Sequence, residues 1–281
     1  MLVCTFDLEP WWTMVPPLVG REGWDRLADR SDEPVERFLD LCDQSGSRAT
    51  FFVVGEYARR FPGRIAAIAA RGHEIGCHSM YHDDLALQPL SQFQEETRVA
   101  KEILEQASGV AVTTFRAPSF SVPRNHLREF YEVLADLGFL LDSSLTSAAR
   151  IYGGAAALGA VGRVFDLYPL AGVSLTEVGV PGVRVFGREW TVFGGGYLRL
   201  VPTRLALAAL RSSPYHVLYL HAHDFDVHCP RVPGASLAQH LRRRLRVGDL
   251  YARVDALLQV NRGRTCTDAA RASSPSSQEV R

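Results

Sequence analysis

Two histidines, His78 and His82, lie four residues apart in the stretch "EIGCHSMYHDD", directly after a short apolar run. If the chain is helical there, residues i and i+4 lie on one face with Cβ atoms roughly 6 Å apart. Two imidazoles at that separation can share a cation, each at about 2.0 to 2.1 Å. Alone, however, the spacing is more typical of two partly exposed histidines, because a third and preferably anionic ligand is missing.

The N-terminal motif "TFDLEP" offers that carboxylate. Asp7 and Glu9 are two residues apart at the end of a strand-like run, so their side chains point roughly the same way. One acid could then bind a metal while the other handles protons. The alternative is a strand-end aspartate that caps a turn, with Glu9 in solvent.

Short β-rich runs alternate with amphipathic segments along most of the chain. Strands are predicted at residues 2–6, 48–54, 73–79, 113–118, 139–144 and 216–225. Helices are predicted over about 33–45, 56–71, 91–108 and 124–137, and most of them end at a glycine. This alternation predicts parallel strands joined by helices, in a barrel or a doubly wound sheet. Such barrels build their active sites at the C-terminal ends of the strands, where the polar residues of this chain gather.

Two segments depart from the alternation. Residues 146–202 are rich in Gly, Val and Pro and predict irregular β structure, in which the glycines of "FGGGYLRLVP" let the backbone approach a neighbour closely. Residues 263–281 contain almost no large apolar side chains, so we expect a disordered tail after a single domain over 1–262.

Composition limits the classes of function. The chain has 281 residues, 47% of them hydrophobic, and a formal net charge of zero, so nothing indicates binding to nucleic acid or to an anionic membrane. The five cysteines are scattered and form no CxxC pair, which favours reduced thiols. No signal peptide is recognisable, and no run approaches the roughly 18 apolar residues of a membrane span. We therefore expect a soluble, cytoplasmic protein.

Six motifs occur in an order that resembles a known family. They are "TFDLEP", "HEIGCHSMYH", "FRAPSFS", "LDSS", "GGGYLRLVP" and "YLHAHDFD", and they span roughly residues 2–260. The family is that of the polysaccharide deacetylases with the NodB-homology fold, carbohydrate esterase family 4. The chain looks most like the branch associated with bacterial exopolysaccharide loci, in which the first motif is Asp-x-Glu.

The resemblance implies a fold and a metal. Family members fold as a distorted (β/α)7-type barrel and use one divalent metal, most often Zn²⁺, with Co²⁺, Ni²⁺ or Mn²⁺ as alternatives. His78 and His82 match the two metal-ligand histidines, and Glu9 takes the place of the metal-binding aspartate.

The resemblance also implies catalytic roles. Asp7 matches the catalytic base, Arg116 of "FRAP" matches the arginine that holds the base, and His221 of "YLHAH" matches the general acid. Asp142 could orient or charge His221, and a strand-end cap is the alternative for this aspartate.

Four further residues are candidates for substrate binding. Trp11 and Trp12 could stack on a sugar ring, although core packing is an equal alternative for one of them, and Tyr197 and Arg199 could line the groove. The family usually carries a tryptophan near His223, in a "HPWEFD"-like segment.

These assignments predict a metal-dependent hydrolase that removes an N-acetyl group from an amino sugar, by metal-activated water with an aspartate base and a histidine acid. The expected partner is a glycan or glycoconjugate precursor in biosynthesis. One alternative is hydrolysis of a linear or cyclic non-sugar amide on the same fold. Another is an inactive relative that only binds carbohydrate.

Overall fold

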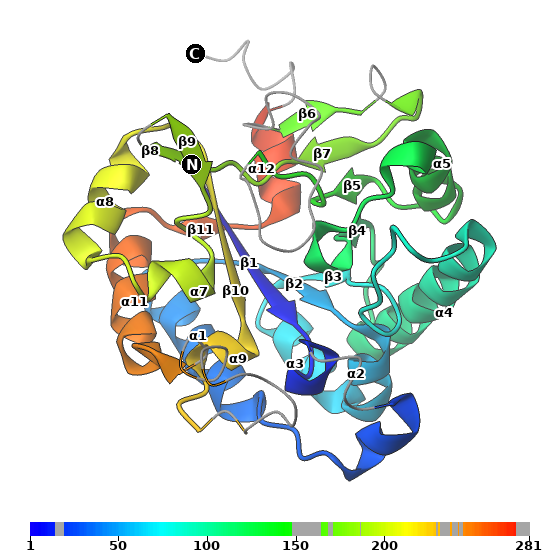
Figure 1. The fold of residues 1–281 in the computed structure, drawn as a ribbon, viewed down its shortest axis with the longest axis horizontal. Helices are drawn as coiled ribbons and strands as arrows, with labels where there is room; N and C mark the ends of the chain where they lie inside the picture. The colour runs from blue at the N-terminus through cyan, green and yellow to red at the C-terminus, as the bar shows by residue number, and fades with distance from the viewer. Residues whose placement is uncertain are drawn as a thin grey trace.

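The structure is a computed structural model that describes residues 1–14, 20–147, 164–167, 171–185, 187–228, 230, 237, 241 and 244–273. Within these ranges, nine strands form one sheet and two form a hairpin (Figure 1). The sheet contains β1 (Leu2–Leu8), β2 (Thr50–Val53), β3 (Glu74–Cys77), β4 (Thr114–Phe115), β5 (Leu141–Asp142), β6 (Val164–Asp166), β7 (Thr176–Val178), β10 (His216–His221) and β11 (Gly263–Arg264). The hairpin pairs β8 (Val183–Val185) with β9 (Arg188–Trp190).

Helices follow most of the strands. The α-helices are α1 (Asp32–Ser45), α2 (Gly55–Arg60), α3 (Pro62–Ala70), α4 (Leu90–Ser108), α5 (Leu127–Asp136), α7 (Gly195–Leu198), α8 (Thr203–Arg211), α9 (Ala222–Phe225), α11 (Leu250–Val260) and α12 (Cys266–Ser273). The 3₁₀ helices are η1 (Trp11–Met14), η2 (Arg21–Arg26), η3 (Pro118–Phe120), η4 (Arg124–His126) and η5 (Val247–Asp249). No helix among the described residues combines the length and the apolar character that crossing a bilayer requires.

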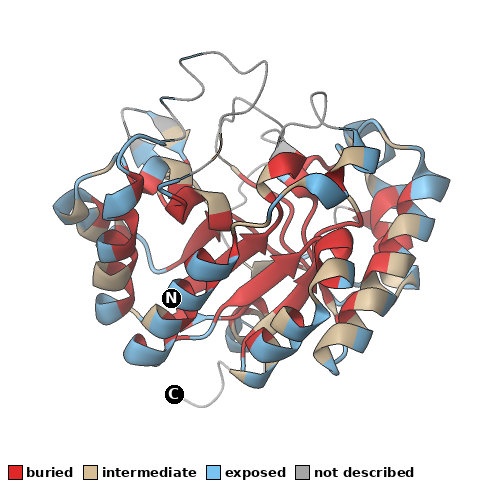
Figure 2. Ribbon diagram, turned by 90° about the horizontal axis from the view of Figure 1, so that it is seen from below, coloured by how far each residue is buried: buried red, intermediate tan, exposed pale blue. Residues whose placement is uncertain are grey.

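The sheet order is β10-β1-β2-β3-β4-β5-β7-β6, with β11 beside β1. All of these pairings are parallel except that of β6 with β7. The sheet curls, and helices pack around the buried strands (Figures 1 and 2). The predicted α/β fold is confirmed, in the form of a curled half-barrel.

Apolar side chains hold the helices against the first strands. Phe6 of β1 lies 4.9 Å from Phe38 and 5.2 Å from Phe51, measured between ring centroids. In α1, the buried residues Val35, Phe38, Leu39 and Cys42 recur at helical spacing on one face. This packing fixes the strand ends from which the site is built.

Two predicted elements differ from the structure, one because it is divided and the other because it ends early. The segment 56–71 is divided into α2 and α3, because Pro62 begins a new helix. The last long strand stops at His221 rather than continuing to residue 225. Asp224 accepts a hydrogen bond from the backbone N–H of His221 at 3.0 Å and caps α9, so the chain turns helical there.

The predicted disordered tail is wrong for residues 263–273. Gly263 pairs with β1, where a Cβ on it would lie 2.8 Å from the Cβ of Cys4, so small side chains are needed for close packing. Polar contacts then hold α12, since Cys266 N–H donates to Thr50 Oγ1 at 2.8 Å and Thr267 Oγ1 donates to Glu74 at 2.6 Å. Residues 274–281 lie outside the described residues.

Candidate active site

Asp7, at the C-terminal end of β1, is held by a buried arginine. Arg116 follows β4 and donates from Nη1 to Asp7 Oδ1 at 2.7 Å and to Thr5 Oγ1 at 2.8 Å. Its Nε and Nη2 donate to the carbonyl and the hydroxyl of Ser143, at 3.1 and 2.9 Å. Arg116 is fully buried, so these contacts fix its guanidinium and leave Asp7 Oδ2 to face the site.

His221 is the residue that faces Asp7. The two are register partners in the β1–β10 pairing, and His221 Nε2 lies 3.7 Å from Asp7 Oδ2. On the other side of the ring, His221 Nδ1 donates to Asp224 Oδ2 at 2.8 Å. Burial acts to lower the pKa of His221, but the charge and hydrogen bond of Asp224, with Glu9 and Asp7, raise it to about 9. The imidazole is therefore held as a cation near neutral pH.

Asp142 does not contact His221, which it could have oriented. As the alternative of a strand-end cap predicts, its Oδ2 accepts a hydrogen bond from the backbone N–H of Ser144 at 3.2 Å. Its carboxylate accepts hydrogen bonds from Ser144 Oγ at 2.6 Å and from the Tyr131 hydroxyl at 3.2 Å, and it lies beside Glu177 of β7. Asp142 belongs to a fully buried polar network below the strand ends, because β5 is not a neighbour of β10. The orienting position belongs to Asp224. The signal for it in the sequence is the spacing of three residues in "HAHD".

Glu9, His78 and His82 meet two residues beyond Asp7. Each offers a ligand atom, and these atoms all lie within 4.8 Å of one another. Glu9 Oε2 is 3.8 Å from His78 Nε2 and closer still to His82 Nε2. The three side chains predicted as metal ligands are therefore brought together, and Glu9 reaches them across the end of β2.

The loop after β3 presents His82 in a turn, so the condition of a helix, under which the i,i+4 spacing was interpreted, is not met. Ser79 and His82 both have positive φ, 59° and 65°, which is uncommon for residues with a side chain. The loop is held by the start of α2, where Gly55 N–H donates to the Ser79 carbonyl and Glu56 N–H to the Met80 carbonyl. The two imidazoles still meet, with ring centroids 5.2 Å apart.

The protonation of His78 and Glu9 suits a cation. Burial acts to lower the pKa of His82, but the charge and hydrogen bond of Glu9 raise it, so a bound metal ion would displace a proton from this ring. His78 Nδ1 donates to the Arg116 carbonyl at 2.8 Å, which leaves the lone pair of Nε2 facing the cluster. Burial lowers the pKa of His78 to about 4, so the ring is neutral at pH 7. Both Glu9 oxygens are buried and accept no regular hydrogen bond from the described residues. Burial acts to raise the pKa of Glu9, but the nearby imidazoles lower it, so Glu9 is an anion. A divalent cation fits this donor set.

The glycine loop supports the acid side of the site. A Cβ on Gly195 would lie 2.1 Å from Asp224 Oδ2, and a Cβ on Gly194 would lie 2.3 Å from the Tyr219 side chain. Gly194 also bridges to Tyr219 of β10. The close approach predicted for this loop is confirmed, and the neighbour it approaches is the carboxylate that holds His221.

The four predicted substrate-binding residues differ in exposure. Trp11 is half-buried and donates from Nε1 to the Ala28 carbonyl at 3.1 Å, and Tyr197 is 37% exposed. Trp12 is fully buried and Arg199 is 5% exposed, so neither presents its side chain to a ligand. The prediction that Arg199 lines the groove is therefore wrong, and for Trp12 the alternative of core packing is confirmed. The 3₁₀ turn η1 sends the second indole into the core, and the charge of Arg199 lies near Asp224, whose pKa it helps to lower.

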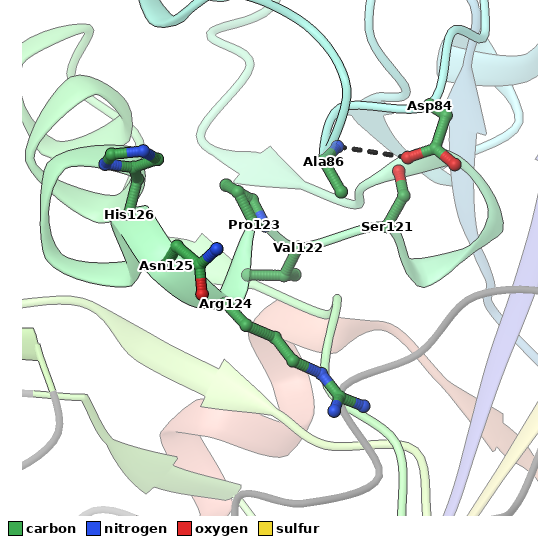
Figure 3. Close-up of a pocket in the computed structure, with 8 residues that line it drawn as sticks. All are labelled: Asp84, Ala86, Ser121, Val122, Pro123, Arg124, Asn125 and His126. Atoms are coloured by element: carbon green, nitrogen blue, oxygen red, sulfur yellow. Dashed lines mark hydrogen bonds between the residues drawn. The ribbon is translucent and has the colours of Figure 1, made fainter.

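A cavity of about 630 Å³ opens two residues after His82 (Figure 3). It lies between the loop after β3 and the segment after η3, which are joined where Leu85 N–H donates to Ser121 Oγ at 3.0 Å. Its lining combines polar and apolar side chains and consists of Asp84, Ala86, Ser121, Val122, Pro123, Arg124, Asn125 and His126. None of the sequence motifs indicated this cavity.

Two family models match the chain. The model "Polysaccharide deacetylase" matches residues 4–139, and a "Domain of unknown function (DUF3473)" matches residues 144–271. The first match contains the candidate metal ligands, Asp7 and Arg116. The second contains His221 and Asp224.

The chain is similar in part to curated deacetylases. A peptidoglycan-N-acetylglucosamine deacetylase of Bacillus cereus is 34% identical over 92 residues, which are 33% of this chain and 34% of that protein. A chitooligosaccharide deacetylase of a Bradyrhizobium species is 35% identical over 81 residues, 28% of this chain and 37% of that protein. The chain thus spans about a third of the length of these relatives.

One solved structure resembles almost the whole chain. The crystal structure of a putative polysaccharide deacetylase from Mycobacterium smegmatis has a TM-score of 0.62 and 21% identity, and covers 96% of this chain and 89% of that one. The likeness supports the α/β fold.

Proposed function

Because this chain carries a polysaccharide deacetylase domain of the NodB-homology, carbohydrate esterase family 4 kind, we propose that it hydrolyses the N-acetyl group of an amino sugar with the help of one divalent metal ion. One observation carries the proposal. Asp7 and His221 face each other at 3.7 Å beside the three candidate metal ligands, and each is held by its own buried partner.

The metal would be held by Glu9, His78 and His82. Two imidazoles and one carboxylate form a donor set typical of catalytic zinc, so we propose Zn²⁺. When bound, such an ion supplies a Lewis acid for the amide carbonyl and lowers the pKa of water.

Asp7 and His221, which face each other, transfer the protons of the proposed reaction. Asp7 accepts the proton of the attacking water through Oδ2, while Arg116 holds Oδ1. His221 donates the proton from Nε2 to the leaving amine, which is a poor leaving group until it is protonated. The C–N bond breaks, and acetate and an amine leave. Asp224 keeps His221 charged before the donation and positions its ring.

The substrate is proposed from the relatives and from the cavity. Two curated relatives are named for peptidoglycan N-acetylglucosamine and for chitooligosaccharide, which both carry N-acetylated sugars. The cavity beside the His82 loop, at about 630 Å³, has the size of an ordinary ligand pocket, and we assign flanking sugar units to it. Trp11 and Tyr197 stay proposed sugar contacts. An exopolysaccharide precursor and a cytoplasmic location stay predictions.

The test is release of acetate by the zinc-loaded protein from chitooligosaccharides and from peptidoglycan fragments. We expect turnover that Asp7→Asn abolishes with metal content unchanged, while Asp136→Asn, at the exposed end of α5, keeps it. Turnover of linear or cyclic non-sugar amides alone would favour the amide-hydrolase alternative. Metal binding and glycan binding without any hydrolysis would favour the inactive relative.

The metal centre has a separate test. His82→Ala removes one candidate ligand, so elemental analysis should find little zinc in the purified variant. The matched control is His126→Ala, which changes an imidazole that is 70% exposed on the surface. Equal zinc content in the two variants would contradict the assignment of the ligands.

A further inference from the structure

His223 is the one imidazole of "HAHDFD" that the proposed reaction does not use. It is the second residue of α9, and its ring stacks on His221 with centroids 4.8 Å apart and planes inclined by 25°. Its side chain is only 15% exposed. The ring is therefore built into the site rather than placed on the surface.

Each ring nitrogen of His223 faces a different carboxylate. Nδ1 lies 3.8 Å from Glu9 Oε1, and Nε2 lies 4.0 Å from Asp224 Oδ1. In both carboxylates the other oxygen is already engaged. Oε2 of Glu9 faces the candidate metal ligands, and Oδ2 of Asp224 holds His221. His223 thus contacts the outer oxygen of the metal-side carboxylate and of the acid-side carboxylate.

These separations are longer than a direct hydrogen bond. A small cavity of about 10 Å³ borders Glu9, His223 and Trp11, and this is about the volume that one water molecule needs. A water-mediated contact or a small ring rotation would complete the link. Ligating carboxylates are generally fixed by a hydrogen bond to their second oxygen, and loss of such a partner commonly weakens metal binding by about 10-fold to 100-fold.

We infer that His223 is a positioning residue that holds Oε1 of Glu9 for metal binding and links it to Asp224 on the acid side. The inference rests on the proposed function only in taking Glu9, His78 and His82 as the metal ligands.

The test measures metal affinity instead of turnover. His223→Phe keeps a stacked ring but removes both nitrogens, and we expect the Kd for Co²⁺ or Zn²⁺, from competition with a chelator at fixed pH, to rise about 10-fold to 100-fold. His223→Gln keeps a hydrogen-bonding side chain and should recover most of the affinity. The visible spectrum of the Co²⁺ protein should change in the Phe variant, because the position of Glu9 changes.

His126→Phe is the matched control, since it makes the same substitution on an exposed imidazole. His223→Leu also lacks both nitrogens and replaces the Phe variant if that variant does not fold. A Phe or Leu variant with wild-type Kd and spectrum would overturn the role of His223 and leave the metal centre standing. A wild-type protein that binds neither metal would instead refute the metal centre itself.

Discussion

Asp224→Asn removes the negative charge beside His221 while keeping the size of the side chain. Asparagine keeps the size of the side chain and can still accept a hydrogen bond from the backbone N–H of His221, but it removes the negative charge beside Nδ1. Both side chains are largely buried, at 20% and 4% exposure, so solvent screens this charge little. The variant therefore tests whether Asp224 is what keeps His221 protonated.

The magnitude follows from the pKa of His221. Burial lowers this pKa, and the carboxylates, with Asp224 first among them, raise it to about 9 from an ordinary 6.5. The net difference corresponds to roughly 3 kcal/mol, at about 1.4 kcal/mol for each pKa unit, and it remains after burial has opposed the contributions of Asp224, Glu9 and Asp7. His78, a buried imidazole without such a close partner, has a pKa of about 4. We expect the pKa of His221 to fall to 6.5 or below in the variant.

The assay is an NMR titration of the imidazole in the metal-free protein, with the His221 signal assigned by its loss in His221→Gln. A pKa of about 9 leaves most of the ring protonated at pH 8, whereas a pKa of 6.5 leaves a few per cent, so the protonated fraction at pH 8 should fall about 30-fold in the metal-free variant. Asp136→Asn is the control. An Asp224→Asn protein with the wild-type titration and pH–rate profile would refute this account of the acid.

Three further predictions concern the same framework. Gly195→Ala should lower kcat about 100-fold because its Cβ would displace Asp224, whereas Gly196→Ala, whose Cβ would lie 3.7 Å from that carboxylate, should stay near wild type in the acetate assay. Asp224→Asn should be less stable than wild type, and the difference should be largest between about pH 4 and 6.5. The reason is that the raised pKa of His221 stabilises the wild-type fold at low pH, and this stabilisation is lost as the pH rises through about 9. Urea unfolding of both proteins at pH 6 and pH 10 measures the difference. Burial and the charge of a neighbouring aspartate raise the pKa of Glu177, so the free energy of unfolding falls as the pH rises and the unfolded chain ionises this carboxyl. Glu177→Gln should therefore lose less unfolding free energy than wild type between pH 6 and 9. Equal slopes of unfolding free energy against pH in the two proteins would contradict the raised pKa.

The half of the site that lies at strand ends could be predicted from the sequence. Asp7, Glu9, His78 and Arg116 each follow a short β-rich run, and parallel strands bring their C-terminal ends to one edge of the sheet. Type and spacing were therefore enough to place these side chains together. His82 also lies beside His78 and Glu9 as expected, although a turn with positive φ rather than a helix places it there.

The errors arose where neighbouring elements, rather than local pattern, decide the structure. Asp142 and Asp224 both lie near the end of a predicted strand region. The strand order separates Asp142 from His221, whereas the turn into α9 brings Asp224 beside it. The paired indoles of Trp11 and Trp12 look alike in sequence, but one turn of 3₁₀ helix sends them in different directions. The small residues of α12 lowered its apparent hydrophobicity, yet Cys266 and Ala269 are buried in a cluster with Val3 of β1.

Strand order also explains how β1 and the residue after it supply both the proposed base, Asp7, and the proposed metal ligand, Glu9. β1 lies between β10 and β2, so Asp7, as the register partner of His221, faces the acid side. Glu9 is two residues further on, past the end of the strand, and reaches over β2 to the histidines that follow β3. β2 ends at Val53 and is followed by Val54, so its end places no charged group between Asp7 and the histidines. A one-residue shift of β1 would turn Asp7 and Glu9 away together, because side chains alternate along a strand. The base and the proposed metal ligand are therefore fixed by a single register.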